Sequence, residues 1–187
     1  MRLFLLIPSY RPHWAWRCVR FYLTEMEPHP FELRTIVASQ NVYPDPCGIQ
    51  KLNECLDLID SDCPSWLFTF ADDTIQHASL FRRLGETIEA KPHARAVMFD
   101  QVTRHAKDGT GVLRVGPNNC RPCHCCGGQV AWRRDFIGNN RFGYAEFGGR
   151  CDGEFIQARY RENPEAFVFV NEPLTYFGSF ETEGVPE

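Results

Sequence analysis

The chain has 187 residues, a net charge of −4 at pH 7 and 43% hydrophobic residues. This length suits one domain with a substantial core, and this composition excludes an intrinsically disordered chain. Basic residues never run beyond a pair such as Arg82-Arg83, so we predict no nucleic-acid partner. The apolar run 3–7 is shorter than the core of a secretory signal, and no stretch is long enough for a transmembrane segment. We therefore predict a cytoplasmic protein.

The first half of the chain alternates short apolar runs with segments of helical periodicity. The predicted strands are 3–7, 33–38, 66–70 and 96–99. The predicted helices are 15–26, 49–59 and 80–88. Such an alternation with short loops predicts a doubly wound, mainly parallel sheet, whose strands end at a common edge.

The second half has a different pattern. The turn sequence Asp108-Gly109-Thr110-Gly111 predicts a hairpin over 102–115. A short strand follows at 129–132, and after an irregular stretch the segment 152–161 is predicted as a helix. The closing strands are predicted at 167–170 and 174–177.

Two adjacent carboxylates, Asp72 and Asp73, follow the apolar strand at 66–70. Charge at a strand end costs little where water or a cation compensates it, and ligands of open α/β sheets bind at this edge. Two other strand exits, Ser9-Tyr10-Arg11 and Gln40-Asn41, are predicted at the same edge. The pair therefore predicts a divalent metal that holds a nucleotide pyrophosphate. The alternative is that these acids cap the next helix, since aspartate is a good N-cap residue.

A second candidate site is the cysteine cluster of the sequence NCRPCHCCG, which begins at Asn119. Its possible ligands are Cys120, Cys123, His124, Cys125 and Cys126, with Cys151 as a more distant candidate. Thiolates can close a structural zinc site, but such a site normally draws on two separated ligand pairs. The pattern therefore favours a reduced, loosely buried loop, with zinc as the alternative.

The order of these motifs resembles the nucleotide-sugar glycosyltransferases of the GT-A fold, in particular the family-2-like group, from about Leu3 to Phe177. The matching stretches are LFLLIPSYRP, FTFADDT, GQVAWRRDFIGNNRFGYAEFGGRCDGEF and FVFVNEPLTYF. The resemblance implies a Rossmann-like three-layer α/β/α fold with a mainly parallel central sheet and a small acceptor-side β/loop region. It implies a single catalytic domain, 1–187, with a nucleotide-binding half (1–104), an acceptor-side half (105–180) and a tail (181–187).

The resemblance also implies a metal-dependent transfer of sugar, with inversion, from a UDP-sugar or related donor to a glycan or other hydroxyl acceptor. Asp73 is expected to bind Mn²⁺ or Mg²⁺ directly, and Asp72 to contact the metal-bound water or the ribose. The other implied nucleotide contacts are Pro8, Ser9, Tyr10, Arg11, Gln40 and Asn53. Asp152 is the expected catalytic base, with Glu154 as the second candidate, because Cys151-Asp152-Gly153-Glu154 replaces the usual Glu-Asp pair.

Two other functions remain open at this point. A nucleotidyltransferase shares a similar sheet and metal chemistry, but it would usually carry a glycine-rich and basic first loop, and PSYRPHW has no glycine. A non-catalytic nucleotide- or glycan-binding module is disfavoured by the presence of both acidic motifs. The sequence does not specify the oligomeric state.

Overall fold

The computed structural model describes residues 1–9, 12–24, 26–39, 49–69, 74–103, 110–143 and 151–177. Its strands are β1 (Arg2–Ser9), β2 (Glu32–Ser39), β3 (Trp66–Thr69), β4 (Thr74–Gln76), β5 (Ala96–Val102), β6 (Val112–Leu113), β7 (Val130–Arg133) and β8 (Phe167–Phe177). Its α-helices are α1 (Pro12–Thr24), α2 (Ile49–Asp57), α3 (Leu80–Ala90), α4 (Arg134–Ile137) and α5 (Cys151–Glu162), and its 3-10 turns are η2 (Pro117–Asn119), η3 (Gly127–Gln129) and η4 (Pro164–Ala166). Each predicted strand and helix is thus present, and the predicted hairpin is formed by β5 and β6.

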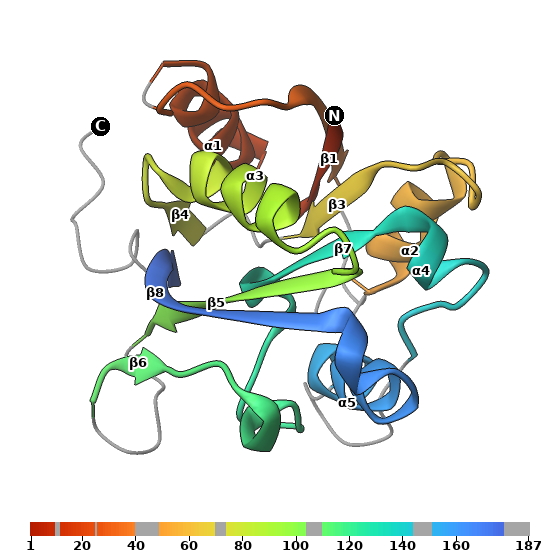
Figure 1. Cartoon of the computed structure of the whole chain (residues 1–187). Helices are drawn as coiled ribbons and strands as arrows, with labels where there is room; N and C mark the ends of the chain where they lie inside the picture. Colours follow the sequence, from red (N-terminus) through yellow and green to blue (C-terminus); the bar gives the residue numbers. More distant parts are fainter. Residues whose placement is uncertain are drawn as a thin grey trace.

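The described strands form one sheet in the order β2-β1-β3-β7-β5-β8-β4, with β6 paired to β5 (Figure 1). β1 lies parallel to β2 and β3, as predicted for the first half. The rest of the sheet is mixed: β5 lies parallel to β8, whereas β7 runs antiparallel between β3 and β5, and β4 runs antiparallel to β8. The chain enters β7 from η3 at the edge where β3 ends, so β7 has to run back in the opposite direction. A buried apolar run carries no information on strand direction.

The two predicted closing strands are one continuous strand, β8. Its parallel register with β5 shifts at Asp100, which lies opposite Pro173, so that Gln101 then faces Thr175. Proline has no N–H for the ladder, and a bulge is where a sheet accommodates it. The far end of β8 thereby continues past the shift and pairs with β4.

Helices cover both faces of the sheet (Figure 1). On one face, buried residues of α1 and α3 pack on the sheet: Ala15, Cys18, Leu80, Phe81 and Leu84 against Leu3, Leu5, Ile7, Phe68 and Phe99. On the other face, α2 and α5 contribute Ile49, Leu52, Leu56, Phe155 and Ile156 against Leu6, Leu67, Met98 and Trp132. The fold is therefore mixed α/β with a helical layer on each side, and it places the start of α5 on the same face as α2.

Helix α3, the first helix after the acid pair, begins too far along the chain for Asp72 or Asp73 to be its N-cap residue. β4 lies between Asp73 and α3, and Ser79 occupies the N-cap position of α3. The alternative that Asp72 and Asp73 cap this helix is therefore wrong. Sequence reasoning missed β4 because three residues are too few to show a period.

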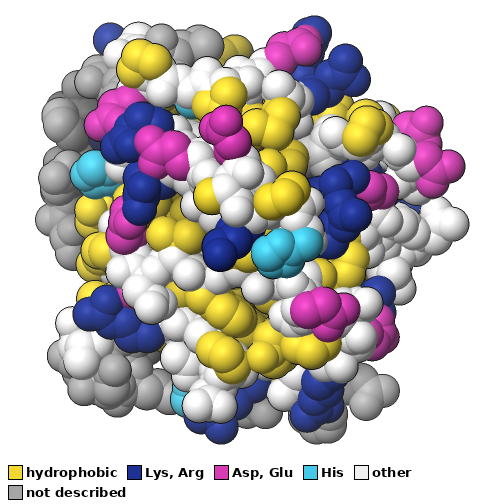
Figure 2. Space-filling model, viewed as in Figure 1, with side chains coloured by type: hydrophobic (Ala, Val, Ile, Leu, Met, Phe, Trp, Pro, Cys, Tyr) yellow, Lys and Arg dark blue, Asp and Glu magenta, His cyan; other side chains and the backbone are white. Residues whose placement is uncertain are grey.

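Basic and acidic side chains alternate on the face that carries α3 and β8, as Figure 2 shows. Arg82 pairs with Glu27 and Glu86, and Arg83 pairs with Glu86 and Glu172. These arginines are thus paired with carboxylates on the surface. Among the described helices, none has the length and apolar character needed to cross a membrane.

Gly85 of α3 lies directly against Pro30, and its replacement by alanine is expected to destabilise the protein. A Cβ atom would lie 2.5 Å from Cγ and 2.8 Å from Cδ of Pro30. Overpacking costs roughly 1–3 kcal/mol, whereas removing a helical glycine gains up to about 1 kcal/mol, so we expect a net loss near ~1 kcal/mol. Urea denaturation measures it, with Gly143→Ala as the control because nothing lies within 4 Å there. A Gly85→Ala variant more stable than the parent would contradict this packing.

Candidate active site

The η3 turn brings together the end of β3 and the start of α5. The hydroxyl of Thr69 donates to the carbonyl oxygen of Gly127 at 3.2 Å, and the amide of Gly127 donates to Oδ2 of Asp152 at 2.6 Å. A Cβ atom at position 127 would lie 3.3 Å from Oγ1 of Thr69 and 3.5 Å from Oδ2 of Asp152. Glycine permits this close approach, so only one residue separates the Asp152 carboxylate from the last residue of β3.

Asp152 occupies the first turn of α5, and both of its carboxylate oxygens accept backbone hydrogen bonds. The second bond comes from the amide of Gly153, at 2.8 Å from Oδ1. Desolvation of the carboxyl raises the pKa of Asp152, and the amides of Gly127 and Gly153 oppose this rise. A carboxylate with a raised pKa in a fixed position has the properties of a general base.

Two glutamines that sequence reasoning missed anchor η3 to β5. The side chain of Gln129 donates to the carbonyl oxygens of Phe99 and Leu113, at 3.1 and 3.0 Å, and accepts from the amide of Cys126 at 3.0 Å. Gln101 accepts the Cys126 thiol hydrogen, with 2.9 Å between Sγ and Oε1. Gln129 and Gln101 are both buried. Glutamine within otherwise apolar strand sequences was the available signal, since buried amides need partners.

The predicted nucleotide contacts are placed in part. Pro8 and Ser9 end β1, which lies beside β3, and they are at the same edge of the sheet as Thr69; their contact with a nucleotide stays a prediction. Tyr10, Arg11, Gln40, Asp72 and Asp73 lie outside the described residues. By sequence, the acid pair falls between Thr69, which ends β3, and Thr74, which begins β4.

Asn53 has a structural contact that the sequence did not indicate. Its amide nitrogen donates to the carbonyl oxygen of Phe142 at 2.9 Å, and its oxygen accepts from the amide of Phe142 at 3.0 Å. This two-bond contact ties α2 to the segment that precedes α5. A contact of Asn53 with the base or ribose stays a prediction.

The cysteines of the cluster contact different groups. Cys120 Sγ lies 3.8 Å from the Met98 sulfur, and Cys125 Sγ lies 3.4 Å from the carbonyl oxygen of Arg121. Burial raises the pKa of Cys120 to about 11 and that of Cys125 to about 12, which keeps both thiols protonated at neutral pH. Among the described residues, no three His, Cys, Asp or Glu side chains form a group that could hold a metal. The described thiols thus contact separate partners, and the choice between a reduced loop and a zinc site stays a prediction, because the Cys151 side chain lies outside the described residues.

Comparison with solved structures shows that this fold is shared with S. aureus TarS. S. aureus TarS 1-349 superposes with a TM-score of 0.68 at 12% identity, covering 97% of this chain and 61% of that chain. S. aureus TarS 1-349 in complex with UDP-GlcNAc gives a TM-score of 0.64 at 9% identity, with 94% and 58% covered. A third structure, S. aureus TarS, gives 0.65 at 10% identity, with 95% and 36% covered.

These likenesses show a shared fold, and the chain spans less than two thirds of the length of each of these TarS structures. No protein-family model and no curated protein sequence matches the chain. The residues of the site therefore have to support any more specific function.

Proposed function

We propose that the protein is a glycosyltransferase that moves a sugar from a UDP-sugar to a hydroxyl group of an acceptor. The observation that carries this proposal is the position of Asp152, whose carboxylate is held through Gly127 beside the end of β3. The Asp72-Asp73 pair follows that strand end in the sequence, and the proposal assigns the base and the acid pair to this one edge of the sheet. A UDP-GlcNAc complex of the structurally similar TarS supports the choice of donor.

Asp152 is the proposed base for the acceptor hydroxyl. Each of its oxygens accepts one amide hydrogen bond, and a carboxylate oxygen has a further acceptor site for the incoming proton. The two amides fix the orientation of the carboxylate, so little further entropy is lost in positioning the base when the acceptor hydroxyl attacks. Direct attack by the acceptor oxygen on the sugar carbon inverts the anomeric centre.

Asp73 is the proposed direct ligand of Mn²⁺ or Mg²⁺, with Asp72 on a metal-bound water or the ribose. Carboxylate oxygens are the ligands that these hard cations prefer, and such sites typically use one or two carboxylates together with substrate phosphates. The bound metal would neutralise charge on the diphosphate leaving group. Pro8, Ser9, Tyr10, Arg11, Gln40 and Asn53 are the proposed contacts to the nucleotide.

Calorimetric titration with UDP, GDP and dTDP, with and without Mn²⁺, tests the donor site. We expect Mn²⁺-dependent binding of UDP, with an affinity at least about tenfold weaker in Asp73→Ala. Even the loss of a residue that only hydrogen-bonds to a metal ligand usually lowers metal affinity by about that factor. Asp62→Ala is the matched control, because Asp62 lies in an exposed turn before the start of β3, whereas the acid pair follows the end of that strand in the sequence.

Each other outcome of this titration contradicts a defined part of the proposal. Binding of UDP that is indifferent to Mn²⁺ and to Asp73→Ala would contradict the metal site. Binding of none of the three nucleotides in the presence of metal would contradict the nucleotide-sugar donor, and with it the transferase.

A further inference from the structure

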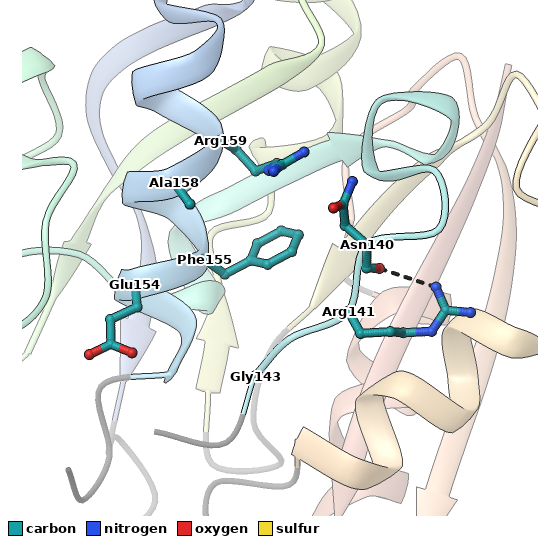
Figure 3. Close-up of a pocket in the computed structure, with 7 residues that line it drawn as sticks. All are labelled: Asn140, Arg141, Gly143, Glu154, Phe155, Ala158 and Arg159. Atoms are coloured by element: carbon teal, nitrogen blue, oxygen red, sulfur yellow. Dashed lines mark hydrogen bonds between the residues drawn. The ribbon is translucent and has the colours of Figure 1, made fainter. Parts of the chain in front are cut away.

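A cavity of ≈ 240 Å³ lies between α5 and the segment that precedes it, beside the start of the helix that carries Asp152 (Figure 3). It is lined by Asn140, Arg141, Gly143, Glu154, Phe155, Ala158 and Arg159. We propose that this cavity binds a neutral sugar unit of the acceptor, next to the unit whose hydroxyl reacts. This inference rests on the proposed function and adds the chemical class of the acceptor.

The cavity continues along α5 from the proposed base. Asp152, Phe155 and Arg159 stand at positions i, i+3 and i+7, which share one face of a helix. Arg159 lies about 10.5 Å beyond Asp152 along the axis, from the rise per residue of an α-helix. A ligand that fills the cavity thus extends toward Asp152 along the same helix face.

The groups in the cavity suit hydroxyl groups. Figure 3 shows Arg159 and the side chain of Asn140 reaching toward each other above Phe155. The Nε atom of Arg159 is buried and has no hydrogen-bond partner, whereas another nitrogen of the guanidinium donates to Glu162 at 2.8 Å. The side-chain nitrogen of Asn140 donates to the carbonyl oxygen of Ile137 at 2.8 Å, and no described residue donates to the side-chain oxygen of Asn140. An N–H donor opposite an amide oxygen matches a hydroxyl, which both accepts and donates.

The charges around the cavity favour a neutral ligand over an anion. Arg159 is paired with Glu162, and Arg141 is paired with Asp57 of α2. Glu154 is exposed at the rim and has no ion pair within the described part of the chain. The positive charges of Arg141 and Arg159 are thus neutralised by their carboxylate partners, while the negative charge of Glu154 is not. An acceptor unit that carries a carboxylate or phosphate would therefore be repelled.

An array of neutral and anionic oligosaccharides, probed in the presence of UDP and Mn²⁺, tests this inference. Wild-type protein is expected to bind neutral glycans, and Arg159→Leu to lose about tenfold in affinity, the usual effect of removing a charged hydrogen-bond donor. Ala158→Leu places extra bulk at the cavity wall from an exposed helix position without removing any hydrogen bond, and it is expected to lose binding equally. Arg161→Leu, at an exposed arginine of the same helix, is the control that keeps full binding.

The affinity for UDP, measured on the same four proteins, separates this inference from the proposed function. Unchanged UDP binding with glycan binding lost in Arg159→Leu and Ala158→Leu supports the subsite. A preference for anionic glycans, binding that persists in Ala158→Leu, or no glycan binding while UDP still binds would overturn it. If the wild-type protein does not bind UDP at all, the proposed donor is overturned instead.

Discussion

Asp152→Asn is expected to lower the rate of sugar transfer by about 10²- to 10⁴-fold, the usual contribution of a positioned general base. Asparagine keeps the size of the side chain but cannot accept the proton of the acceptor hydroxyl. It also places an amide NH₂ where one carboxylate oxygen now accepts from a backbone amide. The measurement is the initial rate at saturating donor, together with the calorimetric affinity for UDP, which should stay within a few-fold of the wild-type value.

Glu154→Gln is the comparison variant, because Glu154 is the second candidate base and lies exposed two residues along the same helix. Since Glu154 also lines the proposed acceptor cavity, the rate of this variant is measured at saturating acceptor as well as saturating donor. We expect its rate to remain close to that of the wild type. A loss of rate in Glu154→Gln with the rate kept in Asp152→Asn would reverse the assignment of the base, which the sequence left between these two residues.

The pH dependence of the wild-type rate follows from the same carboxyl. The base acts in its deprotonated form, so the rate should rise with pH as Asp152 loses its proton. Since desolvation raises the pKa of Asp152, this rise is expected at a higher pH than for an ordinary aspartate. The acid limb should be unchanged in Glu154→Gln. A rate that is flat across the range where carboxyls titrate would contradict Asp152 as the base.

Arg134→Leu is expected to destabilise the protein by roughly 3–5 kcal/mol, which lowers the melting temperature by about 10 °C for a chain of this size. Arg134 is only 2% exposed. It donates to the carbonyl oxygens of Ile59, Leu56 and Gly138, at 3.1, 3.3 and 2.5 Å. Two of these carbonyls belong to the last turn of α2 and the residues after it, where a cation also complements the helix dipole.

Leucine fills much of the same volume but leaves three carbonyl groups without their charged donor. The expected loss of folding stability is large because these three hydrogen bonds are removed together. Arg133→Leu is the control, because within the described part of the chain the neighbouring Arg133 pairs with Asp135 near the surface. Such pairs contribute about 0–1 kcal/mol. Equal losses in the two variants, measured by thermal and urea denaturation, would show that the carbonyl contacts of Arg134 are not what stabilises this region.

The sequence predicted the position of nearly every strand and helix, because buried runs and helical stripes are local signals. It could not predict that β7 runs antiparallel, since an apolar run such as Val130–Trp132 reads the same in both directions. It also missed α4, because a helix of four residues is too short to show a helical period in the sequence. The role of Arg134 as a donor to α2 depends on contacts between distant segments.

For the site, the family resemblance and the place of Asp152 at a helix start led to its prediction as the base. The structure links its carboxylate to the end of β3 through Gly127, and its role as a base stays a prediction. The sequence could not predict that Gly127 is the residue between them, or that Gln129 and Gln101 anchor the turn. These contacts exist only once β3, β5 and α5 are assembled. The roles of Asp72 and Asp73 remain predictions, because the described residues flank the pair without including it.

The contacts that hold Asp152 have a consequence for how the protein folds. Thr69 and Gly127 are 58 positions apart in the chain, and Gly127 and Asp152 are 25 apart. Closing loops of this length costs entropy that is recovered only when the strands on both sides have paired, and folds dominated by such contacts form slowly. The geometry around Asp152 is therefore expected to appear late, in the same cooperative step that completes the sheet. A chain that lacks η3 and β7 would therefore lose the contacts that link the start of α5 to the end of β3.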